Sequence, residues 1–128
     1  MPELRLVSKY GVGLDMIPVD AATARRIPVA NLPGSNTQAV AEYCLAAMLT
    51  LARRLPRFDG AIRQGGWKQT GFRGHELAGA RVGIIGASST ARALITLLKP
   101  FGCDVAVYDP YLTDERAAQL GVRTTTLE

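Results

Sequence analysis

The stretch that decides the fold reads Val82-Gly83-Ile84-Ile85-Gly86-Ala87-Ser88-Ser89-Thr90-Ala91-Arg92, and after a helix-like interval Val105-Ala106-Val107-Tyr108-Asp109-Pro110-Tyr111 follows. This order predicts a strand, a tight turn, a helix and a second strand, which is the βαβ unit that binds dinucleotides. The fingerprint of that unit is Gly-x-Gly-x-x-Gly, and its glycine positions here are Gly86, Ser88 and Ala91. Alanine is tolerated at the third position. The sequence therefore predicts an α/β fold.

Ser88 is the departure that matters for binding. The second glycine of the fingerprint lets the backbone approach the pyrophosphate, so a serine there puts a side chain where the phosphates come closest. A serine hydroxyl also donates hydrogen bonds, which offsets part of the steric cost. The sequence thus indicates the fold more strongly than it indicates dinucleotide binding. We expect Ser88 to weaken that binding. The predicted contacts of the turn are Gly86, Ala87, Ser88, Ser89 and Thr90.

Asp109 supplies the second half of the fingerprint. An acidic residue that ends the second strand, about 20 positions after the turn, accepts hydrogen bonds from the adenosine ribose. Its charge repels a 2′-phosphate, so the pattern favours NAD over NADP. Pro110 follows it directly, and we include both residues in the predicted cofactor site. The alternative is that Asp109-Pro110 only ends a strand.

Composition points to an ordinary globular protein. The chain has 128 residues and a net charge of +4, with apolar and charged fractions typical of a folded domain. Its basic residues are scattered, which argues against a nucleic-acid partner. Cys44 and Cys103 have no metal-site or disulfide spacing, so we expect both to be small buried apolar residues in a reducing compartment. Without a signal segment or a membrane-length apolar run, the expectation is a cytoplasmic protein with no membrane partner and no metal.

The first third of the chain contains short elements. Strands are predicted near Leu4 to Ser8 and Pro28 to Ala30, with a helix from Val19 to Arg26 between them. A glycine-containing loop, Lys9 to Gly13, follows the first strand. Leu32-Pro33-Gly34 breaks the chain and predicts a crossing between domains.

A long helix is predicted from about Asn36 to Arg54. It has no charged residue between Glu42 and Arg53, so it is apolar around most of its circumference. Such a helix is buried on more than one side, and a second copy of the chain is the economical partner. The alternatives are burial by its own chain or by residues beyond Glu128. The candidate interface residues are Val40, Cys44, Ala47, Met48 and Leu51.

The rest of the chain carries weaker signals. After Pro56 the pattern is irregular as far as Lys68, and we expect Trp67 to pack rather than to bind. His75 is the single histidine, and an exposed turn position is its expected role. A helix is predicted from Thr113 to Leu120, and a further short segment begins at Gly121.

The sequence resembles the NAD-dependent D-isomer-specific 2-hydroxyacid dehydrogenases, and the matching segments follow one another in unbroken order along nearly the whole chain. The segments that carry the resemblance include Ser8-Lys9-Tyr10-Gly11-Val12-Gly13-Leu14-Asp15, Ala21-Ala22-Thr23, Asn31-Leu32-Pro33-Gly34-Ser35-Asn36-Thr37, Val40-Ala41-Glu42, Leu51-Ala52-Arg53-Arg54, Gly66-Trp67, Gly74 to Leu77, Gly83-Ile84-Ile85-Gly86 and Tyr108-Asp109-Pro110-Tyr111. The resemblance implies a partial Rossmann-like βαβ unit, the end of a flavodoxin-like substrate domain and a long dimerisation helix. It implies residues 1–33 for the substrate domain and 34–128 for the NAD-binding domain.

The resemblance also implies chemistry. The family transfers a hydride between NAD and a small 2-hydroxy or 2-oxo acid, and the loop residues Lys9, Val12 and Gly13 match the segment that holds the substrate carboxylate. The family's catalytic Arg, Glu and His are expected beyond Glu128, so no catalytic residue is assigned. The expectation is a fragment or degenerate member of this enzyme family with a homodimeric helix 36–54. The alternative is a non-catalytic NAD-binding or dimerising module, as in corepressors of the same fold.

Overall fold

The chain forms two compact units. The computed structural model describes residues 3–67 and 73–128, and Lys68, the end of the predicted irregular segment, lies outside them. The first unit is Met1–Thr37 and the second is Gln38–Glu128. Among the described residues, no helix has the length and apolar character needed to cross a membrane.

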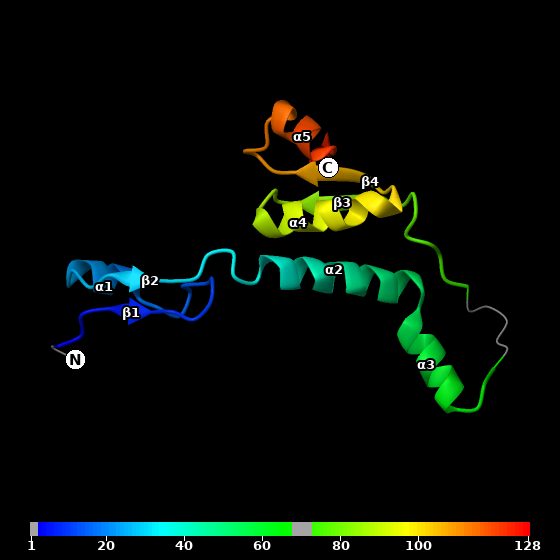
Figure 1. The fold of residues 1–128 in the computed structure, drawn as a ribbon, viewed down its shortest axis with the longest axis horizontal. Coiled ribbons are helices and arrows are strands. Elements are labelled where there is room, and N and C mark those ends of the chain that lie inside the picture. Colours follow the sequence, from blue (N-terminus) through cyan, green and yellow to red (C-terminus); the bar gives the residue numbers. More distant parts are fainter. Residues whose placement is uncertain (1–2, 68–72) are drawn as a thin grey trace. The chain divides into compact units, whose positions relative to one another are not determined.

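The first unit is built on two short parallel strands. Strand β1 (Val7–Ser8) pairs with β2 (Val29–Ala30), and helix α1 (Val19–Ala24) connects them (Figure 1). The predicted strand, helix and strand are confirmed, each shorter than the sequence pattern indicated. Arg26 ends the helical region with a left-handed φ of 56°. The unit is therefore a small βαβ motif that precedes the long helix.

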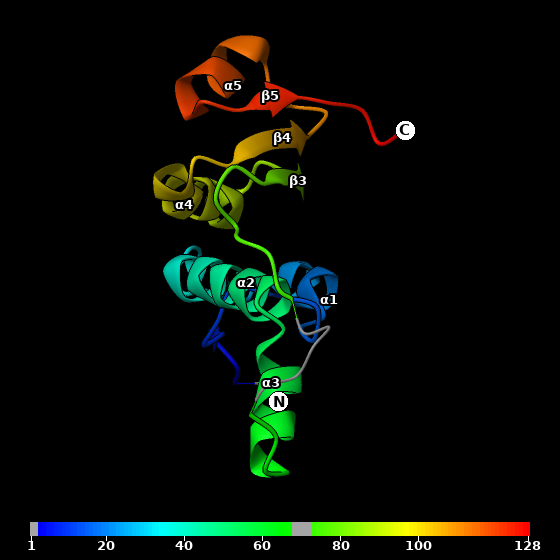
Figure 2. The ribbon, with the colours of Figure 1, turned by 90° about the vertical axis from the view of Figure 1, so that its right-hand side faces the viewer.

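The second unit contains a parallel sheet with the order β3-β4-β5 (Figure 2). Its strands are β3 (Arg81–Ile85), β4 (Asp104–Tyr108) and β5 (Arg123–Thr124). Helix α4 (Ser89–Leu98), extended by the short 3-10 helix η1 (Lys99–Phe101), links β3 to β4, and α5 (Asp114–Leu120) links β4 to β5. Ile85 pairs with Tyr108, so the carboxyl ends of β3 and β4 reach the same edge of the sheet. The predicted βαβ unit is confirmed, and a third short strand follows it.

The core of the second unit lies where α4, α2 and the sheet meet. Ile95, Leu98 and Val107 are its largest fully buried side chains. Leu94, Ile95 and Leu98 fall on one face of α4, because residues three and four apart are neighbours on a helix. Val105 and Val107 fall on one face of β4, because side chains alternate along a strand. The sequence pattern thus places both elements against a common apolar layer.

Helix α2 (Thr37–Ala52) contributes one face to this core. Ala41 is fully buried, and Cys44, Leu45, Met48 and Leu49 pack against the same cluster. Cys44 and Met48 were predicted as interface residues, whereas in the structure they are half-buried and pack against the core of their own chain. Because apolar residues surround the whole helix, their spacing does not distinguish the core face from the opposite one.

The opposite face of α2 carries an exposed apolar stripe. Tyr43 is 74% exposed and Leu51 is 75% exposed, and Val40 and Ala47 lie on the same face by helical spacing. We call these residues the α2 stripe: Val40, Tyr43, Ala47 and Leu51. The predicted burial of α2 on more than one side is therefore not provided by the described part of its own chain.

Helix α3 (Leu55–Arg63) lies where the sequence predicted an irregular segment. The prediction is wrong because Pro56 stands in the first turn, where its missing N–H costs nothing and its fixed φ suits a helix. Trp67 is 84% exposed, so the expected packing of this side chain is also wrong. Both errors lie between the end of α2 and the return of the chain at Gly74.

The chain returns to the end of α2 at Gly74. The N–H of His75 donates to the carbonyl of Ala52 at 2.9 Å, which satisfies a carbonyl at the end of the helix. A Cβ on Gly74 would lie 2.6 Å from that oxygen and 3.0 Å from the Cα of Arg53. A glycine is therefore required at this close approach. His75 itself is exposed, as predicted.

Candidate functional site

Gly86 forms the turn at the end of β3. Its φ of +90° lies in the left-handed region, which L-residues with a side chain rarely adopt. Its N–H donates to the carbonyl of Tyr108 at 2.7 Å, so the turn is joined to the end of β4. A Cβ added here would meet no atom within 4 Å. The requirement for glycine is therefore conformational rather than steric.

Ser88 begins helix α4 in a relaxed conformation. Its φ of −64° and ψ of 175° are ordinary for an N-cap residue, and its hydroxyl accepts a long hydrogen bond of 3.5 Å from the N–H of Ala91. The N–H groups in the first turn of a helix point away from its carbonyl groups and carry a partial positive charge. The serine therefore causes no backbone strain, and this end of α4 retains the features of an anion site.

Asp109 holds the turn from the end of β4. Its Oδ2 accepts a hydrogen bond from the N–H of Ala87 at 2.6 Å, and its Oδ1 accepts one from the N–H of Tyr111 at 2.8 Å. These bonds, first that from Ala87 and then that from Tyr111, lower the pKa of the Asp109 carboxyl. Asp109 is thus an anion near neutral pH, and it orders the glycine turn as well as offering acceptors to a ribose.

These residues line a cavity of about 230 Å³ at the carboxyl edge of β3 and β4. Gly86, Ala87, Ser88 and Asp109 were predicted from the sequence, and the structure brings them together there. Ser89, Thr90 and Pro110 were also predicted but are not among its lining residues. The residues that the sequence analysis missed are Arg92, Tyr111, Leu112 and Arg116.

The predicted substrate loop lies in the first unit and is held by backbone and amide hydrogen bonds. The N–H of Lys9 donates to the carbonyl of Ala30 at 2.8 Å, and Asn31 Nδ2 donates to the carbonyl of Val12 at 2.8 Å. A Cβ on Gly13 would lie 3.0 Å from Asp15 Oδ2. Asn31 therefore holds this loop in place, and it was not among the predicted site residues.

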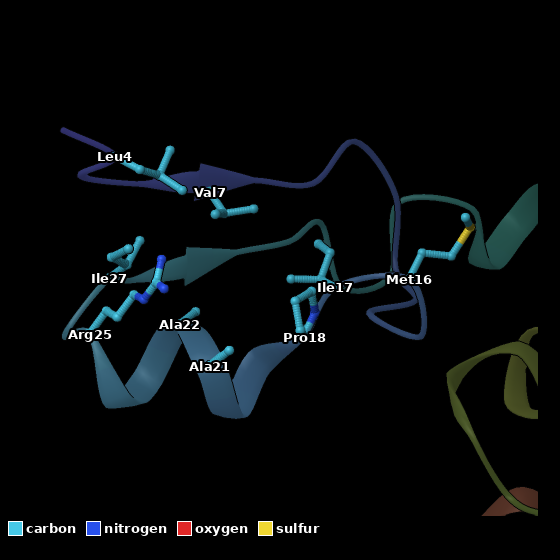
Figure 3. Close-up of a pocket in the computed structure, with 9 residues that line it drawn as sticks. All are labelled: Leu4, Val7, Met16, Ile17, Pro18, Ala21, Ala22, Arg25 and Ile27. Atoms are coloured by element: carbon cyan, nitrogen blue, oxygen red, sulfur yellow. The ribbon is translucent and has the colours of Figure 1, made fainter. Parts of the chain in front are cut away.

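A separate hollow of about 260 Å³ lies between α1 and the strands of the first unit (Figure 3). Figure 3 shows apolar side chains around it, with Arg25 as the charged member. A small carboxylate needs several converging donors, so this lining does not match a 2-hydroxy acid. In residues 3–67 and 73–128, no group of three or more His, Cys, Asp or Glu is arranged to hold a metal ion.

A parallel βαβ unit with a glycine turn and an acidic residue after its second strand defines a dinucleotide-binding domain. Residues 45–128 match the family model described as "D-isomer specific 2-hydroxyacid dehydrogenase, NAD binding domain". The chain belongs to this family. The predicted family, the Rossmann-like fold class and the cofactor NAD are thereby confirmed.

The similar proteins are longer dehydrogenases. The chain is 41% identical over 127 residues to D-3-phosphoglycerate dehydrogenase of Mycobacterium tuberculosis, covering 99% of this chain and 24% of that protein. It is 36% identical over 128 residues to the Bacillus subtilis enzyme of the same name, covering 100% of this chain and 24% of that protein. D-lactate dehydrogenase from Aquifex aeolicus, solved with NAD and lactic acid, superposes with a TM-score of 0.88 at 28% identity, covering 99% of this chain and 38% of that one.

Proposed function

We propose that this chain is the cofactor-binding part, with the end of the substrate domain, of a dehydrogenase that transfers a hydride between NAD and a small 2-hydroxy or 2-oxo acid. The main support for the proposal is the link between the glycine turn and Asp109, which accepts a hydrogen bond from the N–H of Ala87. The glycine turn and the acidic residue meet at the carboxyl edge of neighbouring parallel strands, where α/β sheets bind their ligands. The similar enzymes named above support the substrate class.

Different residues would bind different parts of the cofactor. The turn from Gly86 to Thr90 and the first N–H groups of α4 would face the pyrophosphate, and Asp109 would accept hydrogen bonds from the ribose. NAD, when bound, supplies the carbon that accepts or gives the hydride. The loop containing Lys9, Val12 and Gly13 would hold the substrate carboxylate through backbone N–H groups. We assign residues 1–33 to the substrate domain on this basis and 34–128 to the cofactor domain.

Calorimetric titration with NAD tests the cofactor site. Replacing Asp109 with Ala removes the ribose acceptors and releases the N–H of Ala87, so we expect binding to weaken by about tenfold or more. Asp104→Ala is the matched control, because this aspartate starts the same strand at its opposite end and pairs with Arg123 at 2.8 Å. Equal losses in the two variants would contradict the assignment.

Self-association is the second candidate function, and the α2 stripe favours it. Four apolar or small residues at helical spacing leave one side of α2 uncovered in the described structure, and a second copy offers the same face. We therefore propose a homodimer through the predicted helix 36–54, with Tyr43 and Leu51 as its most exposed contacts. This candidate holds whether the intact protein is an enzyme or a non-catalytic module.

Sedimentation of stripe variants tests the dimer. Leu51→Asp would bury an unpaired charge at the contact and is expected to give a monomer. Gln38→Asp introduces the same charge at an exposed position on the side of α2 away from the stripe and should leave the dimer intact. A wild-type monomer at micromolar concentration, or equal behaviour of the two variants, would contradict the proposal. Met48→Asp is unsuitable, because Met48 packs in the core.

A further inference from the structure

The two peptide groups that flank Ala87 are held by side chains of opposite charge. The N–H of Ala87 donates to Asp109 Oδ2 at 2.6 Å, and the carbonyl of Ala87 accepts from Arg92 Nε at 2.9 Å. Asp109 follows β4, whereas Arg92 lies on α4, so the two side chains reach the glycine turn from different elements. The cofactor site as proposed uses Asp109 and leaves Arg92 without a role.

Arg92 binds a carbonyl that lies outside the hydrogen-bond ladder of α4. The N-cap residue Ser88 has an extended ψ of 175°, so the chain before it leaves the helical path. The backbone N–H of Arg92 donates to the Ser88 carbonyl at 3.0 Å, and the N–H of Ala91 donates to the Ser88 hydroxyl. Ala87 is 6% exposed, and a buried carbonyl needs a hydrogen-bond partner. The guanidinium of Arg92 supplies that partner.

The bond to Arg92 also sets the direction of a backbone donor. A peptide group is planar and trans, so the carbonyl of Ala87 and the N–H of Ser88 point in opposite directions. Because the carbonyl is fixed on Arg92 Nε, the Ser88 N–H is held pointing away from that nitrogen. Ser88 belongs to the turn that would face the pyrophosphate. A donor that is already ordered before binding reduces the entropy lost when the anion binds.

The charge of Arg92 acts on the other half of this arrangement. The pKa of the Asp109 carboxyl is lowered by its hydrogen bonds from Ala87 and Tyr111 and, more weakly, by the positive charge of Arg92. Arg92 and Asp109 also line the same cavity. The guanidinium therefore binds the carbonyl of Ala87 and helps to keep the acceptor of the Ala87 N–H ionised.

We propose that Arg92 is a positioning residue for dinucleotide binding, which holds the peptide group between Ala87 and Ser88 in the orientation that the pyrophosphate requires. The inference rests on the proposed cofactor site and adds a residue of α4 to it. The role belongs to the Nε donor rather than to the charge, because Nε is the atom that bonds to the turn. Arg92 is thus the counterpart of Asp109, which holds the preceding peptide group.

Three replacements of Arg92 separate the donor from the charge. The side-chain amide nitrogen of glutamine is as many bonds from Cα as the Nε of arginine, so Arg92→Gln keeps a donor at this position and loses the charge. Arg92→Lys keeps the charge but has a carbon atom at the position of Nε. Arg92→Met has neither the donor nor the charge. Arg81→Met is the matched control, because it removes the same charge from the start of β3, at the end of that strand away from the turn.

Calorimetric titration of the whole chain with NAD tests the proposal, together with the chemical shift of the Ala87 carbonyl carbon in the free chain. We expect Arg92→Gln to bind NAD within about twofold of wild type, and Arg92→Lys and Arg92→Met to bind it about tenfold more weakly. The carbonyl signal should move to lower frequency in the Lys and Met variants, because the carbonyl loses its hydrogen bond. Arg81→Met should change neither the affinity nor the shift.

The outcomes separate the role of Arg92 from the cofactor site itself. Wild-type NAD affinity in Arg92→Met would overturn the role of Arg92 and leave the NAD site standing. A loss in Arg92→Gln with wild-type affinity in Arg92→Lys, or an equal loss in all three variants, would overturn the role of the Nε donor. An unchanged Ala87 carbonyl shift in Arg92→Met would refute the hydrogen bond without reference to NAD. Failure of the wild-type chain to bind NAD would overturn the cofactor site together with this inference.

Discussion

Replacing Gly86 with alanine tests whether NAD binding depends on the backbone conformation of the glycine turn. The φ of +90° lies in the left-handed region, which L-residues with a side chain rarely adopt, so the strain should reach about 2 kcal/mol. No atom lies within 4 Å of the added Cβ, so packing contributes nothing further. Relief of the strain requires rotation of the turn, which pulls the N–H of Ala87 away from Asp109. We therefore expect NAD binding to weaken by about tenfold or more.

Gly102→Ala is the matched control for this variant. Gly102 also has a left-handed φ, +63°, with no atom within 4 Å of an added Cβ, but it ends η1 away from the cofactor cavity. Its cost should be about 1 kcal/mol, a loss of about 4 to 8 °C in Tm, with unchanged NAD affinity. Thermal unfolding and NAD titration measure both effects. Wild-type NAD affinity in Gly86→Ala, despite a lower Tm, would show that NAD binding does not depend on the conformation of this turn.

Variants at three other positions test the turn, the end of α2 and the start of β4. Ser88→Gly should tighten NAD binding by about tenfold if lost phosphate contact dominates; equal affinities would mean that the serine hydroxyl replaces the contact. Gly74→Ala should destabilise the fold by about 2 to 4 kcal/mol, since its Cβ would meet the carbonyl of Ala52 at 2.6 Å. Gly60→Ala, whose Cβ would point into open space on α3, should instead stabilise the fold by about 0.5 to 1 kcal/mol. Similar Tm values for the two variants would contradict this prediction. The hydrogen bond from the Arg123 guanidinium on β5 lowers the pKa of the Asp104 carboxyl in the folded protein. The stability that this bond contributes is therefore present above the unfolded pKa of about 4 and is lost as the pH falls through the lower folded pKa. Asp104→Asn should flatten the pH profile of Tm there, and an unchanged profile would contradict the assignment.

The glycine turn and Asp109 could be predicted because their signals are local. Gly86 and Asp109 stand at fixed offsets from two apolar strands, and parallel pairing brings the ends of such strands together. The same logic did not reveal Arg92 and Arg116. They belong to different helices, and only the packing of α4 and α5 places them at one cavity.

The interface residues on α2 show a different limit of the sequence. Cys44 and Met48 have the same apolar character as Val40 and Leu51, so composition does not say which pair faces the core. Gly74 shows a third limit. Its requirement for glycine comes from a carbonyl on Ala52, far away in the sequence, and becomes evident only when the chain has folded back. Local patterns thus predicted the elements, whereas contacts between elements decided the faces.

The most direct test of a cofactor site at the glycine turn is an amide chemical-shift titration of the chain with NAD. We expect the N–H signals of Ala87, Ser88 and Thr90 to shift together with that of Tyr111, because the turn and the Asp109 loop form one site. Signals around Asp104, at the other end of β4, should stay in place. Saturable shifts confined to the first unit, or no shifts at the turn at NAD concentrations that saturate binding, would contradict the cofactor site.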